Sequence, residues 1–103
     1  MTNYRNGARI EYKAKAELEK DGYYVIRSAG SHGVFDLVAI GFGKLRLIQL
    51  KRTRSKKPNI DKLFKKDMQL IYDFCARHTC PENTDFELWV WKKNGKEWVK
   101  RAV

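Results

Sequence analysis

The chain has 103 residues, of which 43% are hydrophobic and 13% are aromatic. This length allows one domain with one modest core, and this composition excludes a disordered tail. No apolar run is long enough to span a membrane, and the N-terminal stretch lacks the apolar core of a signal peptide. We therefore expect a protein of the cytoplasm.

Positive charge is concentrated in the middle of the chain. The net charge is +10, and residues 44–66 carry ten basic residues against one acidic residue. A basic face that is merely solvated is the plain explanation, but so local an excess favours a polyanionic partner, most often nucleic acid. The side chains that we expect to hold backbone phosphates are Arg52, Arg54, Lys56, Lys57, Lys62, Lys65 and Lys66.

The first half of the chain reads as one helix and three strands. A helix over residues 5–20 is predicted because Ile10, Ala14 and Leu18 recur every four residues and Gly22 follows the run. Residues 23–29, 34–41 and 44–52 are rich in β-forming residues and are joined by short glycine-containing turns. Links this short predict an antiparallel meander.

The second half reads as a loop, a helix and a hairpin. Residues 53–59 form a basic loop, and Asn59 is the expected N-cap of one amphipathic helix reaching about His78. Cys75 falls on the apolar stripe of this helix and is expected to be buried. Strands at 86–93 and 96–103 flank a two-residue Asn-Gly turn, and the helices should cover the two faces of the sheet. Three tryptophans of the hairpin belong either to the core or to a partner surface: Trp89, Trp91 and Trp98.

Four polar residues interrupt the predicted apolar faces. Asp36 breaks the second strand, and Gln49 and Lys51 share one face of the third strand, because side chains alternate along a strand. Glu11 lies seven residues before Leu18, close to two full helical turns, and so falls on the buried stripe of the first helix. A buried carboxylate needs a partner, and the candidates for Glu11 are Lys51, a metal ion, or both.

This set of side chains suits a metal-assisted reaction on phosphate. The Glu11 and Asp36 carboxylates and the Gln49 amide oxygen are the hard ligands that Mg²⁺ prefers. A lysine beside them can orient attacking water or stabilise charge that develops on phosphorus. With the basic stretch nearby, the expected substrate is a phosphodiester backbone, whereas the plain alternative is a set of satisfied ion pairs in the core.

The sequence resembles the PD-(D/E)XK nuclease superfamily and, within it, the archaeal-type Holliday junction resolvases, which some viruses and phages also carry. The resemblance spans nearly the whole chain and is carried by "GYYVIRSAGSHGVFDLVAI", "LIQLKR", the lysine-rich loop and "KDMQLIYDF". It implies an α/β, restriction-endonuclease-like fold with a central mixed five-stranded sheet flanked by helices in the order α-β-β-β-α-β-β. It also implies a homodimer, Mg²⁺ dependence with Mn²⁺ able to substitute, and paired symmetric nicks at four-way DNA junctions, in the host cytoplasm if the source is a virus or phage.

The resemblance also assigns roles to residues. Glu11 and Asp36 match the metal-binding acids, Lys51 matches the catalytic lysine, and Gln49 stands where the family usually has an acid. The "RSAGSHG" segment matches a serine-containing loop beside the family's active site. Ser28 and Ser31 would contact phosphate or support the metal site, and His32 would be a substrate contact or a turn residue. The further DNA contacts implied are Arg9 and Arg27.

Three other functions remain open at this point. A nuclease of the same superfamily acting on flap, nicked or duplex DNA would carry the same residues. A non-catalytic DNA-binding module would have Gln49 as the mark of a decayed site. An RNA-binding protein could stack bases on Tyr23, Tyr24 and Phe35, although these fit a strand core better.

Overall fold

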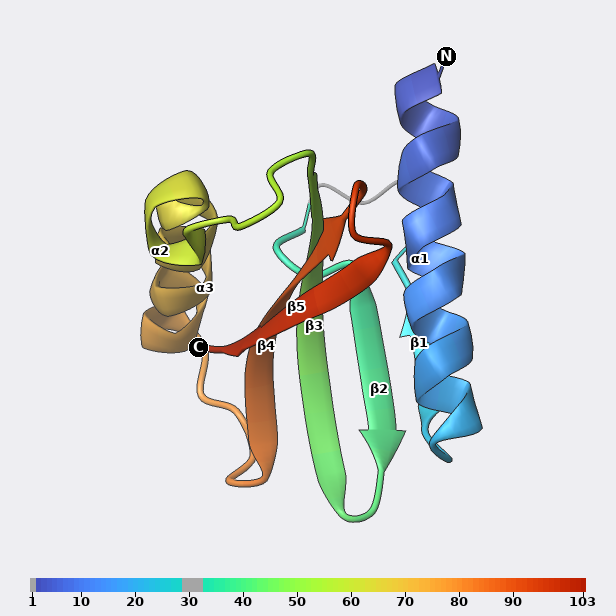
Figure 1. Cartoon of the computed structure of the whole chain (residues 1–103). Coiled ribbons are helices and arrows are strands. Elements are labelled where there is room, and N and C mark those ends of the chain that lie inside the picture. Colours follow the sequence, from blue (N-terminus) through green and yellow to red (C-terminus); the bar gives the residue numbers. More distant parts are fainter. Residues whose placement is uncertain (1, 29–32) are drawn as a thin grey trace.

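The chain folds as a five-stranded sheet with helices on both sides, as the computed structural model shows (Figure 1). The structure describes residues 2–28 and 33–103, with the side chains of the first helix from Arg9 onward. Among these residues, no helix combines the length and the apolar character needed to cross a membrane. The elements are α1 (Thr2–Lys20), β1 (Tyr24–Arg27), β2 (Leu37–Gly41), β3 (Lys44–Thr53), α2 (Ile60–Leu63), α3 (Lys65–Arg77), β4 (Thr84–Lys92) and β5 (Glu97–Ala102).

The strands lie side by side in the order in which they occur in the chain, β1-β2-β3-β4-β5. The predicted antiparallel meander of β1, β2 and β3 is confirmed, and β4 and β5 form the predicted antiparallel hairpin. Only the β3–β4 pair is parallel within this sheet, because α2 and α3 carry the chain back between these two strands. The sheet is therefore mixed, as the family resemblance implied.

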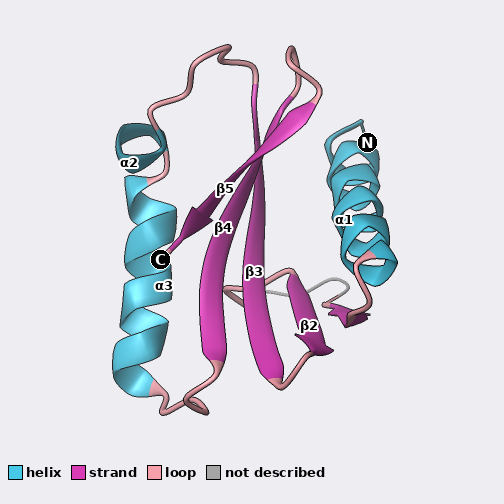
Figure 2. Cartoon of the chain, turned by 60° about the horizontal axis from the view of Figure 1, so that its bottom comes forward, coloured by secondary structure: helices cyan, strands magenta, loops and turns pink. Residues whose placement is uncertain are grey.

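Each face of the sheet has its own core, with α1 on one side and α2 and α3 on the other (Figure 2). Ile10, Ala14 and Leu18 of α1 pack against alternate residues of the sheet, including Trp89. Trp89 is completely buried, and Trp91 and Trp98 pack against the same cluster. The tryptophans thus belong to the core beneath α1.

The predicted long helix is in fact two helices that meet at Phe64. The backbone of Phe64 leaves the helical region (φ −117°, ψ 30°), and its ring packs against the core on this side of the sheet. The N-cap prediction is confirmed, since the Asn59 side chain accepts the Lys62 N–H. The prediction for Cys75 is wrong, because its thiol is exposed. Phe74 makes the core contact instead, and the next residue is rotated by about 100° toward solvent.

The predicted two-residue Asn-Gly turn of the hairpin is also wrong. Four residues, 93–96, connect β4 to β5, and Lys96 takes a left-handed conformation with φ +51° while Gly95 does not. Four-residue connections are most often built around a type I turn, whereas two-residue connections use type I′ or II′ turns. The turn is shaped by its contacts with a segment that is distant in the sequence. The residue pattern of the hairpin alone cannot reveal such contacts.

Candidate active site

Gln49 places an unpaired oxygen inside the protein, near the middle of β3. The strand lies in the middle of the sheet, with Gln49 opposite Leu88 of β4. Gln49 is only 6% exposed, and its Oε1 atom has no hydrogen-bond partner among the described residues. A buried polar atom without a partner is costly and is rare in native proteins. The amide oxygen is therefore placed as a ligand atom would be.

Asp36 lies directly before β2, beside the same part of β3. Its Oδ2 atom accepts the Leu50 N–H at 2.7 Å, just beyond the last β2–β3 pair. Burial raises the pKa of Asp36, the Leu50 hydrogen bond opposes that rise, and the charge of Glu11 adds to it. The positive charge of Lys51 has the smallest of these effects on the pKa and lowers it. Asp36 thus feels the charges of both predicted partners, which places all three side chains in one neighbourhood.

Glu11 reaches this neighbourhood from α1 and is paired with an arginine. Its side chain is 18% exposed, and its Oε2 accepts Arg27 Nη1 at 3.1 Å. Arg27 also lies over the ring of Tyr12, 4.6 Å from the ring centroid. Of the candidate partners for Glu11, Lys51 is not the one that the structure shows, since Lys51 pairs with Asp67 of α3 (Lys65–Arg77). Arg27, predicted as a DNA contact, holds the carboxylate of a predicted metal ligand.

Lys51 has an ion-pair partner that the sequence reasoning missed. Its Nζ atom lies 3.1 Å from Oδ1 of Asp67, in the first turn of α3. Asp67 directly precedes Met68, the first buried residue of α3. A position beside the apolar stripe of the helix was the only indication in the sequence that Asp67 could reach a residue of the sheet. The pair draws the lysine toward the α3 side of the sheet and fixes where its charge lies.

These donors fit a hard divalent cation. Within the described parts of the chain, no three His, Cys, Asp or Glu side chains gather as a metal site. The third oxygen here belongs to an amide, so the set consists of two carboxylates and the unpaired Gln49 oxygen. Mg²⁺ is commonly held by one or two carboxylates and keeps several waters, so the types of donor present suit this cation.

The raised pKa of Asp36 predicts how stability varies with pH in metal-free buffer. The carboxyl of Asp36 has a pKa near 3.8 in the unfolded chain and a higher pKa in the folded protein. Just above pH 3.8 the folded protein therefore binds more protons than the unfolded chain does. The stability contributed by the protonated group is therefore present below pH 3.8 and is lost as pH rises through the folded-state pKa. We therefore expect the difference in unfolding free energy between wild type and Asp36→Asn, measured with urea, to change against wild type as the pH rises from 3.8 through the folded-state pKa of Asp36. A relative stability that rose with pH would contradict the shift.

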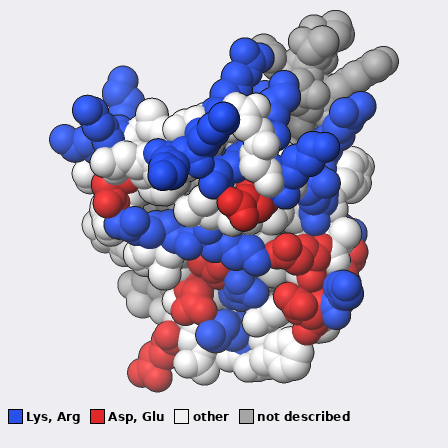
Figure 3. Space-filling model, in the orientation of Figure 1, with Lys and Arg blue, Asp and Glu red and all other residues white. Residues whose placement is uncertain are grey.

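A surface of unpaired cations surrounds the C-terminal end of β3. Figure 3 shows Lys and Arg gathered over the upper half of one face, around the β3–α2 loop, with most acids lower down. Lys65 and Lys66 open α3, where the helix dipole disfavours positive charge, so their presence there favours an anionic partner. The predicted phosphate-binding cations that form no ion pair within the described chain are Arg52, Arg54, Lys56, Lys57, Lys62, Lys65 and Lys66.

The remaining predicted contacts lie on α1 and around the segment after β1. Arg9 is exposed on α1. Ser28 is half-buried, and its N–H donates to the Asp36 carbonyl at 2.9 Å, which joins the start of the serine segment to the site. Ser31 and His32 lie outside the described residues.

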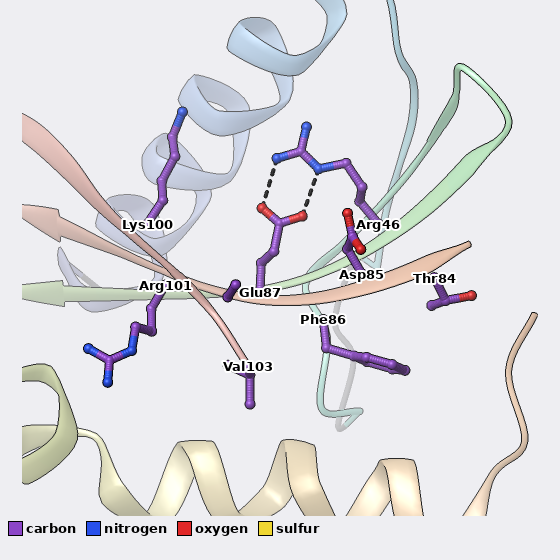
Figure 4. A pocket seen from close by; sticks show the side chains of 9 residues that line it. Arg46, Thr84, Asp85, Phe86, Glu87, Lys100, Arg101 and Val103 are labelled. Atoms are coloured by element: carbon purple, nitrogen blue, oxygen red, sulfur yellow. Dashed lines mark hydrogen bonds and ion pairs between the residues drawn. The ribbon is translucent and has the colours of Figure 1, made fainter. Parts of the chain in front are cut away.

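A second polar cluster, near the N-terminal end of β3, is fully paired. Arg46 donates to both carboxylate oxygens of Glu87, at 2.6 and 2.7 Å, as the dashed lines in Figure 4 show. Trp89 Nε1 donates to the same carboxylate at 2.9 Å. The hydrogen bond to Glu87 raises the pKa of Arg46 further. The Arg46, Glu87 and Trp89 side chains are thus paired with one another and form a structural cluster, while the Thr84 hydroxyl of the same pocket has no partner among the described residues.

The sheet and the helices flanking it define a restriction-endonuclease-like fold, with an acid before the second strand and Gln-x-Lys on the third. A model of the family described as archaeal Holliday junction resolvase (Hjc) matches residues 2–100. The chain belongs to this family.

Two relatives agree with this assignment. The chain is 39% identical over 71 residues to a protein named crossover junction endodeoxyribonuclease Hjc, from Methanocaldococcus jannaschii. The match covers 69% of this chain and half of that protein. The fold is similar to that of Archaeoglobus fulgidus Hjc, with a TM-score of 0.63 over 91% of this chain and 73% of that one. At 19% identity, the second match shows the fold alone.

Proposed function

We propose that this protein is a divalent-metal-dependent endonuclease that resolves four-way DNA junctions by paired symmetric nicks. The observation that carries the proposal is the buried, unpaired Gln49 oxygen, on a stretch of β3 whose residues Ile48 and Leu50 are hydrogen-bonded to Asp36. Family membership and the names of the relatives support the choice of substrate. The cytoplasm, where DNA is accessible, is the expected place of action.

In this proposal Glu11, Asp36 and Gln49 hold the cation. A bound Mg²⁺ or Mn²⁺ supplies Lewis acidity toward a phosphate oxygen and lowers the pKa of water. Asp36 keeps its orientation through the Leu50 N–H, and Glu11 keeps its own through Arg27. Lys51 stabilises negative charge that develops on the phosphate, and Asp67 limits where its ammonium group can lie.

The test of the proposal is a substrate panel. Labelled four-way junction, flap, nicked duplex and linear duplex are incubated with the protein, with Mg²⁺ and with EDTA. We expect Mg²⁺-dependent nicks at symmetric positions in the junction and slower cleavage of the other three. Preferential cutting of a flap or of plain duplex would favour the alternative nuclease function. Tight binding with no Mg²⁺-dependent cutting of any substrate would favour a non-catalytic module.

Gln49→Glu is expected to tighten metal binding. The substitution puts a third negative charge beside the cation, and we expect the Kd for Mn²⁺ to fall by about tenfold, the lower end of what ligand-shell changes produce. The metal-free protein should lose stability, because the added carboxylate is buried, on a stretch of β3 whose backbone is hydrogen-bonded to Asp36. Calorimetric titration with Mn²⁺ measures the affinity directly. Gln69→Glu, on the exposed side of α3, is the matched control, and an equal effect there would exclude Gln49 as a ligand.

We propose further that the protein acts as a homodimer through the face of β1 and β2 that α3 leaves open. Tyr24, which pairs with Ile40, is 69% exposed, and Ile26 and Ile40 are each nearly half exposed. Apolar side chains exposed together mark interaction surfaces, and a two-fold dimer supplies the second site that paired nicks need. Sedimentation should show a dimer that Tyr24→Lys with Ile40→Lys dissociates. Leu63→Lys, at an equally exposed leucine of α2, should remain dimeric, and a monomeric wild type would refute the proposal.

A further inference from the structure

The turn of the C-terminal hairpin lies against the loop that follows β3, at the top of Figure 1 and again in Figure 2. The N–H of Lys93 donates to the Thr53 carbonyl at 2.9 Å. The Asn94 side chain donates to the Arg54 carbonyl at 2.6 Å, across 40 residues of sequence. The parallel β3–β4 pairing ends at Thr53 and Lys92, so these two bonds extend the contact beyond the sheet. The loop and the turn therefore leave the sheet as one unit.

This unit carries only positive charge. Neither residues 52–57 nor residues 93–96 include an acid. By contrast, Lys44, Arg46 and Lys51 of β3 are each ion-paired. A cluster of like charges without counter-ions from the protein is suited to bind an anion. Its cations, none of which forms an ion pair within the described chain, are Arg52, Arg54, Lys56, Lys57, Lys93 and Lys96.

We propose that the loop and the hairpin turn form one phosphate clamp on an arm of the DNA, in which Lys93 and Lys96 contact phosphates and Asn94 is a positioning residue. The inference rests on the proposed nuclease function. Thr53 lies two residues beyond Lys51, about 7 Å along the strand at ~3.3 Å per residue. The clamp therefore starts close to Lys51 on the same strand, and it would hold DNA backbone near the phosphate that this lysine faces.

The backbone of Lys96 supports a role for its side chain. A φ of +51° is disfavoured for an L-residue, and glycine takes this conformation more readily. A lysine at a backbone position better suited to glycine costs stability. Its presence there is consistent with a function that needs the positive charge of the side chain. It also permits a clean test, because Lys96→Gly removes the charge while relieving the backbone.

The test measures how salt weakens binding to a synthetic four-way junction, by fluorescence anisotropy in EDTA so that no cleavage occurs. Lys93→Ala with Lys96→Gly should weaken binding about tenfold and reduce the slope of log affinity against log salt by about 2, since each lost phosphate contact removes about 0.9. The matched control is Lys20→Ala with Lys44→Ala, at the far ends of α1 and β3, and should bind as wild type does.

Asn94→Ala tests the positioning role separately. It removes no charge, so the salt slope falls only if the loop cations no longer lie on phosphates. We expect a smaller slope and a severalfold loss of affinity, with an unchanged melting temperature. An unchanged slope and affinity would overturn the role of Asn94.

Two outcomes separate the clamp from the nuclease function. A wild-type protein that nicks the junction, together with a Lys93→Ala, Lys96→Gly variant that binds it with wild-type affinity and slope, would overturn the clamp alone. A wild-type protein that binds neither junction nor duplex DNA would overturn both.

Discussion

Asp36→Asn is expected to abolish junction cleavage while it makes the protein more stable. The substitution removes one of the two carboxylates proposed to hold the cation, and the loss of metal assistance is worth about 4 kcal/mol or more, roughly a thousandfold in rate. An asparagine oxygen can still accept the Leu50 N–H, so the local geometry persists. The variant also removes a buried charge that Glu11 repels, and we expect a gain of about 1 kcal/mol in unfolding free energy.

Single-turnover nicking and urea denaturation measure the two effects. Affinity for the junction in EDTA should stay equal or improve, because a negative charge near the phosphates is lost. Asp73→Asn, at an exposed acid of α3, is the control and should change neither activity nor stability. Nicking by Asp36→Asn at the wild-type rate would remove Asp36 from the mechanism.

The fold could be predicted from the sequence because its signals are local. The four-residue spacing in α1 specifies one helix and its buried face, and the run of β-forming residues in β3 specifies a strand, which is buried on both faces. Short links force the antiparallel meander, and a helical connection allows the parallel β3–β4 pair. Two helices on opposite faces then follow from the need to cover both sides of the sheet.

The four residues of the candidate site, Glu11, Asp36, Gln49 and Lys51, could be singled out from the sequence because they break those same local patterns. Their partners could not, because the pairs depend on how separate elements approach each other. Glu11 meets Arg27 of β1, and Lys51 meets Asp67 of α3. In both cases the partner sits where a charged residue is unremarkable, at a strand end or in the first turn of a helix.

The turn and helix errors have the same origin. Phe64 leaves the helical conformation as its ring joins the core, although its sequence neighbourhood favours a continuous helix. The Asn94-Gly95 pair is a strong local signal for a two-residue turn, yet the Asn94 side chain is used to bind the Arg54 carbonyl. Tertiary contacts override local preference at both positions.

Glu87→Ala is expected to give the largest loss of stability. Glu87 is buried on β4, facing α1, and accepts both bonds from Arg46 as well as one from Trp89. Truncation leaves a largely buried guanidinium and an indole N–H without acceptors, which costs about 3 kcal/mol. For a domain of this size that corresponds to a fall of about 15 °C in melting temperature. Asp85→Ala, two residues away on the same strand, breaks only an exposed pair with Lys44 and should barely move the midpoint.

A double variant separates the cost of an unpaired charge from the worth of the pair. Arg46→Met with Glu87→Leu removes both charges and fills the site with apolar groups of similar volume. Because the attraction within a buried ion pair is largely offset by desolvation, the double variant should recover most of the stability that Glu87→Ala loses. The recovery stays incomplete, since Trp89 Nε1 still lacks its acceptor. If the double variant were as unstable as Glu87→Ala, the ion pair itself would hold β3 to β4. The attraction between Arg46 and Glu87 would then contribute to the stability of the fold beyond offsetting the cost of burying the two charges.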